Sequence, residues 1–151
     1  MKLEYALMDK FIKLVTLNAR KDTRCIQENN PTSLTDMQAI TLQYIMVESK
    51  KRDVFAKDLE EFFDIKPSSV SSLVSYLENA GFVVREPMPG DRRLLKLIVT
   101  DKGWEVEDWI MKAIDKSIMS GFSDMTEDEL RDLLELLEKL EKNFRKAAYG
   151  E

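Results

Sequence analysis

The most constraining feature of this sequence is a pair of β-prone runs, residues 82–87 and 94–99, in a chain whose other apolar residues recur at helical spacing. The segment between them, residues 88–91, has Pro89 and Gly90 at the central positions that a type II turn prefers. Two such runs joined by a tight turn predict an antiparallel hairpin. We therefore expect a mainly α-helical chain with one small β-hairpin.

The segment directly before the hairpin, Pro67 to Ala80, predicts a helix that ends at Gly81. One buried stripe is expected, formed by Val70, Leu73, Val74 and Leu77. The opposite face is mostly serine, whose hydroxyl competes for backbone hydrogen bonds and weakens a helix, so such a face usually has another purpose. The outward residues are Ser68, Ser69, Ser71, Ser72, Ser75 and Tyr76.

Five further segments show the apolar periodicity of amphipathic helices. Thr35 with Gln38, and Thr126 with Glu129, are spaced to form capping boxes at two of the N-termini. In the segment after Thr35, the expected apolar face consists of Ile40, Tyr44, Ile45 and Val47. The five segments run from Leu3 to about Gln27, from Thr35 to Ser49, from Phe55 to Phe63, from Thr100 to about Gly121, and from Thr126 toward the C-terminus.

The composition excludes several classes of function. The chain has no histidine and one cysteine, Cys25, so we expect no zinc site, internal disulfide, catalytic triad, cofactor or enzymatic activity. Cys25 is next to Arg24, but an ordinary structural cysteine is expected more than a redox sensor. No apolar run reaches the roughly 20 residues that span a bilayer, and the start does not resemble a signal peptide. We therefore expect a cytoplasmic protein without a membrane partner.

The net charge of −5 by itself disfavours a nucleic-acid partner. The acidic residues are concentrated at one end of the chain. Residues 50–100 carry nine basic and eight acidic side chains, whereas residues 101–151 carry eight basic and fourteen acidic ones. Because the central region is close to neutral, the case for DNA binding depends on its motifs.

A short helix, a turn, a second helix and a hairpin follow one another in the central region, and this is the order of a winged helix-turn-helix. The sequence resembles the MarR family of transcriptional regulators. The residues that carry the resemblance are Ala56 to Leu59, Pro67 to Val74, Leu77 to Arg85, Asp91 to Arg93, and Leu97 to Gly103. It implies one compact domain, with a DNA-binding winged helix-turn-helix in residues 34–100 and dimerisation helices in residues 1–30 and 101–151.

Small hydroxyl side chains allow a helix to lie close to phosphates and base edges, where serine can donate or accept hydrogen bonds. The six outward residues of the Pro67–Ala80 helix are therefore candidates for DNA contact, and Lys57 and Lys66 are candidates for phosphate contact. The alternative is that the serines cap the helix and form a solvated face. MarR proteins often carry arginine or lysine where Ser75 and Tyr76 stand here, so the preferred bases stay open.

Two arginines, Arg92 and Arg93, follow the predicted turn, from which a guanidinium can reach a phosphate or enter a narrow minor groove. The resemblance implies that Arg93 enters the groove and that Asp91 holds the wing tip in shape. A charged, solubilising hairpin tip is the alternative. Arg85 and Lys96 are weaker candidates for phosphate contact.

The apolar stripes of the first and last helices are too extensive for one small domain, and MarR-like proteins pair these ends to form a dimer. The resemblance implies a homodimeric repressor that binds a pseudo-palindromic operator in double-stranded DNA. It also implies release from the DNA by a small aromatic or phenolic effector. Phe11, Tyr44, Trp104 and Trp109 could line an effector cleft, but aromatic residues at helical spacing more often belong to a core. The alternative function is a winged-helix protein-interaction module without sequence-specific DNA binding.

Overall fold

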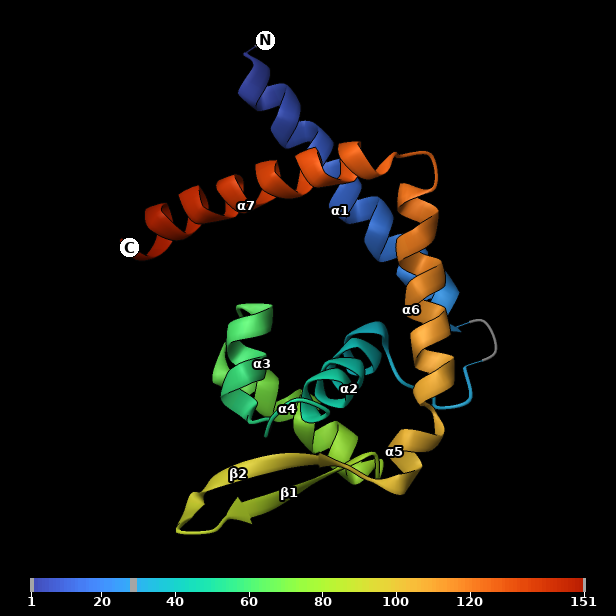
Figure 1. Cartoon of the computed structure of the whole chain (residues 1–151), viewed down its shortest axis with the longest axis vertical. Helices are drawn as coiled ribbons and strands as arrows, with labels where there is room; N and C mark the ends of the chain where they lie inside the picture. The colour runs from blue at the N-terminus through green and yellow to red at the C-terminus, as the bar shows by residue number, and fades with distance from the viewer. Residues whose placement is uncertain (1, 28–29, 151) are drawn as a thin grey trace. The chain divides into compact units, whose positions relative to one another are not determined.

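The computed structural model describes residues 2–27 and 30–150, and describes their side chains except at residues 18–27 and 117. Its elements are α1 (Leu3–Gln27), α2 (Asp36–Ser49), α3 (Ala56–Phe63), α4 (Pro67–Asn79), β1 (Val83–Met88), β2 (Asp91–Val99), α5 (Asp101–Glu105), α6 (Glu107–Phe122) and α7 (Glu127–Tyr149) (Figure 1). The expected helical fold with one antiparallel hairpin is confirmed. The chain divides into two compact units, Met1–Ser117 and Ile118–Glu151, and each is described by itself.

The core of the first unit is formed by α2, α3, α4 and the base of the hairpin. Three of the residues predicted to be inside α4, namely Val70, Val74 and Leu77, are fully buried, and Leu73 is partly buried. The predicted face of α2 was wrong in part, because the residues buried there are Ala39, Thr41, Leu42, Ile45 and Met46. Helix α2 packs against α4 and β2, so apolar residues point inward from more than one side of it.

The segment after the hairpin was expected to be one helix, and the structure divides it into α5 and α6 at Val106. Thr100 caps α5 as its hydroxyl accepts from the Gly103 N–H at 3.1 Å and donates to the Gly81 carbonyl at 2.6 Å. Gly103 packs so closely that a Cβ there would lie 2.5 Å from the Phe82 carbonyl oxygen. This tight packing holds α5 against the base of the hairpin, and α6 follows as a separate helix.

Helices α1 and α7, one from each unit, expose large apolar side chains. In α1 these include Leu3, Leu7, Phe11 and Leu14, and in α7 they include Leu134, Leu137, Leu140 and Phe144. Both predicted capping boxes are present, at Thr35 before α2 and at Thr126 before α7. Among the described residues, no helix is long and apolar enough to cross a membrane.

Candidate nucleic-acid interface

The turn between α3 and α4 sets the position of the serine-rich helix. Helix α3 ends at Asp64, which adopts a left-handed conformation with φ of 51°, and the Ile65 N–H donates to the Glu60 carbonyl at 3.3 Å. Pro67 then occupies the first turn of α4, where its fixed φ suits a helix and its missing N–H costs nothing. The predicted helix-turn-helix is therefore present, with α4 as its second helix.

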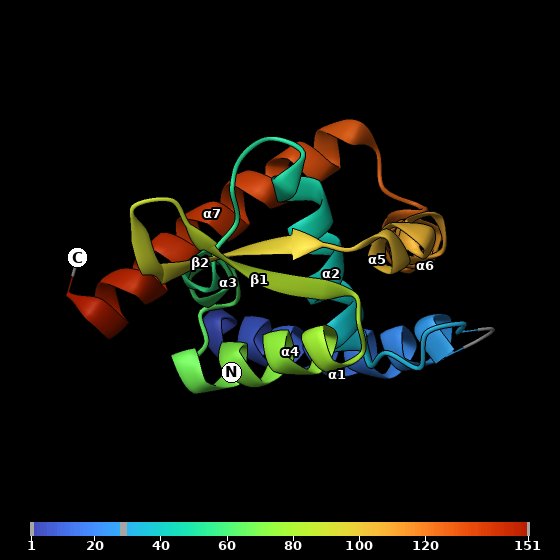
Figure 2. The same ribbon diagram turned by 90° about the horizontal axis from the view of Figure 1, so that it is seen from below.

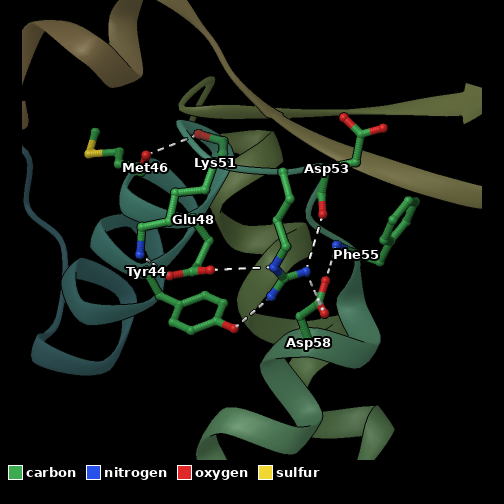
Figure 3. Close-up of polar contacts among 9 residues, drawn as sticks. Tyr44, Met46, Glu48, Lys51, Asp53, Phe55 and Asp58 are labelled. Carbon is green, nitrogen blue, oxygen red and sulfur yellow. Dashed lines mark hydrogen bonds and ion pairs between the residues drawn. The ribbon is translucent and has the colours of Figure 1, made fainter.

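A cluster of polar side chains fixes the first helix of this motif to α2. Arg52 lies between the two helices, and its Nη1 is 2.8 Å from Asp58 Oδ1 while its Nε is 3.4 Å from Glu48 Oε2. Asp58 also accepts from the Phe55 N–H at 2.7 Å, which caps α3. Figure 3 shows the side chains of Tyr44, Glu48 and Asp58 converging on this point. The cluster orients α3, and through the short turn it orients α4.

The charges in this cluster stabilise one another. A hydrogen bond from Lys51 is the main cause that lowers the pKa of Glu48, and the hydrogen bond to Asp58 is the main cause that raises the pKa of Arg52. Burial raises the pKa of the Tyr44 hydroxyl. Both carboxylates of the cluster are therefore held as ion-pair partners.

The outer face of α4 carries the predicted contact residues. Ser68, Ser69, Ser71, Ser72 and Tyr76 are exposed, and the Ser72 hydroxyl donates back to the Ser68 carbonyl at 3.0 Å. Ser75 differs from them, because it is partly buried and accepts a hydrogen bond from Arg85 at 3.1 Å. The only acidic residue within α4 is Glu78, and it forms an ion pair with Arg85 at 2.9 Å. The exposed face of α4 is therefore polar and uncharged.

The N-terminus of α4 offers few backbone donors to a phosphate. The Ser69 N–H already donates to the Lys66 carbonyl at 2.9 Å, so it is not free for a phosphate. Pro67 has no N–H to offer. Within the described part of the chain, no side chain caps this terminus, and the Ser68 N–H remains there as a donor.

The wing tip presents both predicted arginines. Gly90 has a φ of 91°, the left-handed conformation that a type II turn requires at that position. The register changes between Pro87, which pairs with Leu95, and Met88, which pairs with Asp91, so the tip is irregular. Asp91 Oδ1 accepts from the Arg93 N–H at 3.0 Å and lies 3.4 Å from its Nε. The Arg93 side chain is nevertheless 94% exposed, and Arg92 is exposed as well.

The other predicted cations differ in their exposure and in the ion pairs that they form within the protein. Lys66 and Lys57 are exposed, and Lys57 forms a long ion pair with Glu61 at 3.8 Å. Lys96 is 2.6 Å from Asp53, beside the bridge that joins β2 to Phe55. The guanidinium of Arg85 contacts Glu78 and Ser75 on α4. Figure 2 shows the hairpin extending from the end of α4, so α4 and the wing are neighbours within the first unit.

The proposed effector residues lie in different environments. Tyr44, Trp104 and Trp109 pack against the core, as aromatic residues at helical spacing usually do, and Phe11 is exposed on α1. The side chain of Cys25 lies outside the described residues. No group of three or more potential metal-binding side chains occurs in the described part of the chain.

Comparisons with known proteins find similarity to MarR-type regulators. A sequence model of the MarR family matches residues 32–94, from just before α2 into β2. The chain is 33% identical to the HTH-type transcriptional regulator PecS of Dickeya dadantii over 78 residues, which make up 50% of this chain and 47% of PecS. It is 29% identical to the regulator BilQ of Clostridioides difficile over 124 residues, which make up 79% of this chain and 82% of BilQ. Over these residues the chain is similar to MarR-type transcriptional regulators.

Solved MarR-type structures share the fold. The crystal structure of MarR is 25% identical, with a TM-score of 0.67 over 97% of this chain and 93% of MarR. A MarR variant from E. coli complexed with operator DNA is 20% identical, with a TM-score of 0.70 over 93% of this chain and 99% of that one. An organohalide-sensing regulator in its 2,4-dichlorophenol-bound form is 17% identical, with a TM-score of 0.80 over 99% of this chain and 85% of that one. The match to PecS spans less than half of the length of PecS.

One residue in this region was not among the predicted site residues. Glu78 is seven residues before Arg85, and the turn at Gly81 brings the two side chains together. Opposite charges on either side of a helix stop are the sequence signal that could have suggested this pair. The signal is weak, because the geometry of the turn decides whether the two groups meet.

Proposed function

We propose that this chain is a sequence-specific transcriptional regulator that inserts α4 into the DNA major groove and places the wing tip at the adjacent minor groove. The observation that carries the proposal is the outer face of α4. In a chain of net charge −5, the one carboxylate of this helix is paired with Arg85, so no free negative charge within α4 opposes a phosphate backbone. Small hydroxyls on this face permit close approach to the bases.

The wing supplies the positive charge that α4 lacks. Arg93 is almost fully exposed but tethered at its base by Asp91, so its guanidinium can reach outward without a large loss of conformational freedom. Arg92, Lys57 and Lys66 add exposed cations from the wing, α3 and the start of α4. In this proposal the helix provides fit and modest base contacts, and the wing provides much of the electrostatic attraction.

The regulator is proposed to act as a homodimer on a pseudo-palindromic operator. The apolar side chains that α1 and α7 expose exceed what a monomer usually leaves in water, and a second copy of the chain would cover them. Two recognition helices related by a two-fold axis then fit half-sites roughly 34 to 36 Å apart. We further propose repression in the cytoplasm, relieved by a small aromatic or phenolic ligand, as the family resemblance suggests.

Selection from a pool of random DNA duplexes tests this function directly. The purified chain is expected to enrich a site with two-fold related half-sites about 10 base pairs apart. Binding to the selected duplex, measured by fluorescence anisotropy, should be at least about 1,000-fold tighter than binding to a scrambled duplex. It should also weaken steeply as salt rises, because phosphate contacts release counterions.

The same experiment separates the alternative function. A protein-interaction module would enrich no sequence and would bind the selected and scrambled duplexes equally. A duplex from the region upstream of the chain's own gene is a second probe. Equal binding to all of these duplexes by the purified dimer would refute the regulator proposal.

A further inference from the structure

Arg85 makes a set of contacts that join the wing to the serine-rich helix. It is on β1, and its Nη1 lies 2.9 Å from Glu78 Oε2 at the end of α4. Its Nη2 donates to Ser75 Oγ at 3.1 Å and lies 3.5 Å from the Ser71 carbonyl oxygen. One guanidinium thus contacts three residues along α4 from the strand that follows it.

The burial of these groups distinguishes Arg85 from the wing-tip arginines. The Arg85 side chain is 25% exposed and Glu78 is 34% exposed, whereas Arg93 is 94% exposed. Partial burial strengthens an ion pair, because fewer waters compete for the charged groups. The guanidinium of Arg85 is therefore committed to α4, although its charge and place on the wing first suggested a phosphate contact.

The contact with Ser75 also affects whether the Ser75 hydroxyl donates or accepts its next hydrogen bond. A serine hydroxyl has one proton to donate and two lone pairs to accept with. Because Arg85 donates to Ser75 Oγ, the hydroxyl proton of Ser75 is left to donate elsewhere. Arg85 thereby biases Ser75 toward acting as a hydrogen-bond donor on the recognition face.

We propose that Arg85 is a positioning residue that locks β1 to α4, so that the wing and the recognition helix meet DNA as one rigid body. This inference rests on the proposed DNA-binding function. Glu78 is an acidic residue beside the DNA-facing surface. In this proposal it favours DNA binding, because it holds Arg85 in place. Long-range electrostatics alone predicts the opposite, because a carboxylate near DNA should repel phosphates.

The Glu78→Gln variant separates the two explanations by the sign of its effect. It removes one negative charge with little change in shape, so simple electrostatics predicts tighter binding to the selected duplex. Loss of the lock predicts binding about tenfold weaker, since a charge-assisted hydrogen bond is lost. Glu86→Gln is the matched control, because Glu86 is exposed on β1 next to Arg85 and its neutralisation changes the net charge equally. Its binding should be unchanged or slightly tighter.

Substitutions of Arg85 test whether its charge or its geometry matters. Arg85→Lys keeps the charge but cannot contact Glu78 and Ser75 with one planar fork, so it should bind about as weakly as Arg85→Gln. For both variants, the slope of log affinity against log salt should stay within about 0.3 of the wild-type slope. A direct phosphate contact would instead give rescue by lysine, and a slope lower by about 0.9 in the glutamine variant.

Amide hydrogen exchange without DNA gives a readout that does not depend on the proposed function. Arg85→Gln and Glu78→Gln should each speed exchange in β1 and β2 by at least about tenfold, while α2 and α3 exchange as in the wild type. Unchanged exchange in the hairpin, or tighter DNA binding by Glu78→Gln, would overturn the proposal. If the wild type selects no duplex, the regulator function fails, and exchange in the hairpin still decides whether Arg85 locks the wing.

Discussion

Helices α4 and α7 both expose a long face, but the residues on the two faces differ in kind. The exposed residues of α4 are four serines, a tyrosine and Asn79, together with Pro67 at its start, and its one carboxylate is paired. Helix α7 contains seven acidic residues and exposes leucines and a phenylalanine between them. A surface suited to a polyanion avoids unpaired carboxylates, whereas a surface suited to another protein combines apolar side chains with charges around them. We therefore assign α4 to DNA and α7 to a second copy of the chain.

The two helices also begin differently. Thr126 and Glu129 form a full capping box before α7, in which the Thr126 N–H donates to Glu129 Oε2 at 2.8 Å. No side chain within the described part of the chain caps α4. An uncapped N-terminus is less favourable for a helix alone, but it leaves a backbone donor available for an anion. Each of the following predictions tests this contrast between α4 and α7.

The largest effect is expected from charges placed on the apolar face of α7. In the double variant Leu137→Glu and Phe144→Glu, two exposed apolar side chains become acidic, so the proposed dimer should dissociate. Sedimentation should give a monomer, and affinity for the two-half-site duplex should fall by about 100- to 1,000-fold because bivalent binding is lost. Lys142→Ala on the same helix is the control and should remain dimeric. A dimeric double variant would contradict the assignment of α7.

A carboxylate on α4 should have the next largest effect. Ser72→Glu places a negative charge on the face assigned to DNA, and we expect about 100-fold weaker operator binding from repulsion of the phosphates. Glutamate is a good helix former, so the circular dichroism spectrum should not change. Ser72→Ala should weaken binding about fivefold, because one hydroxyl contact is lost.

The matched control for this variant is Asn143→Glu, which adds the same charge to an exposed position of α7. Its operator affinity should stay within about twofold of the wild type. Equal losses from Ser72→Glu and Asn143→Glu would mean that net charge, and not a face of α4, governs binding.

Removal of the wing-tip guanidinium should have a smaller effect. Arg93→Ala is expected to weaken operator binding about tenfold and to lower the salt-dependence slope by about 0.9, as for the loss of one phosphate contact. The fold and the dimer should be intact, because the contacts of Arg93 in the described part of the chain are with Asp91 at the tip. Arg131→Ala on α7, which removes an exposed arginine paired with Glu127, should leave the slope unchanged. An unaltered slope in Arg93→Ala would remove Arg93 from the interface.

The smallest effect concerns the capping box of α7. A hydrogen bond from the Thr126 backbone is the main cause that lowers the pKa of Glu129 below its ordinary value. A lowered pKa in the folded state means that the cap stabilises α7 above the ordinary pKa of glutamate and is lost as pH falls through the lowered one. NMR titration should find the pKa of Glu129 below the ordinary value for a glutamate, with faster amide exchange in the first turn of α7 at acidic pH. Glu129→Gln, which keeps an acceptor but does not titrate, should show no such pH dependence in that turn.

Local signals in the sequence predicted much of the fold. The hairpin turn at Gly90, the capping boxes at Thr35 and Thr126 and the inner stripe of α4 were predicted from neighbouring residues, and the structure confirms them. The face of α2 was predicted less well, because a helix with neighbours on several sides is apolar on several sides and shows no single stripe. The exposure of Arg92 and Arg93 fits their predicted place at the wing tip, and their contact with DNA stays a prediction.

The positions of the turns, the starts of most helices and the residue types that α4 exposes could be predicted from the sequence, because they depend on groups only a few residues apart. The division of the helix after the hairpin at Val106 could not be predicted in this way, because it depends on the close packing at Gly103 that fixes α5. The same holds for Arg85, which contacts Glu78 and Ser75 instead of facing solvent. These contacts join different elements, so they depend on the angles between helix and strand, and packing of the whole core sets those angles.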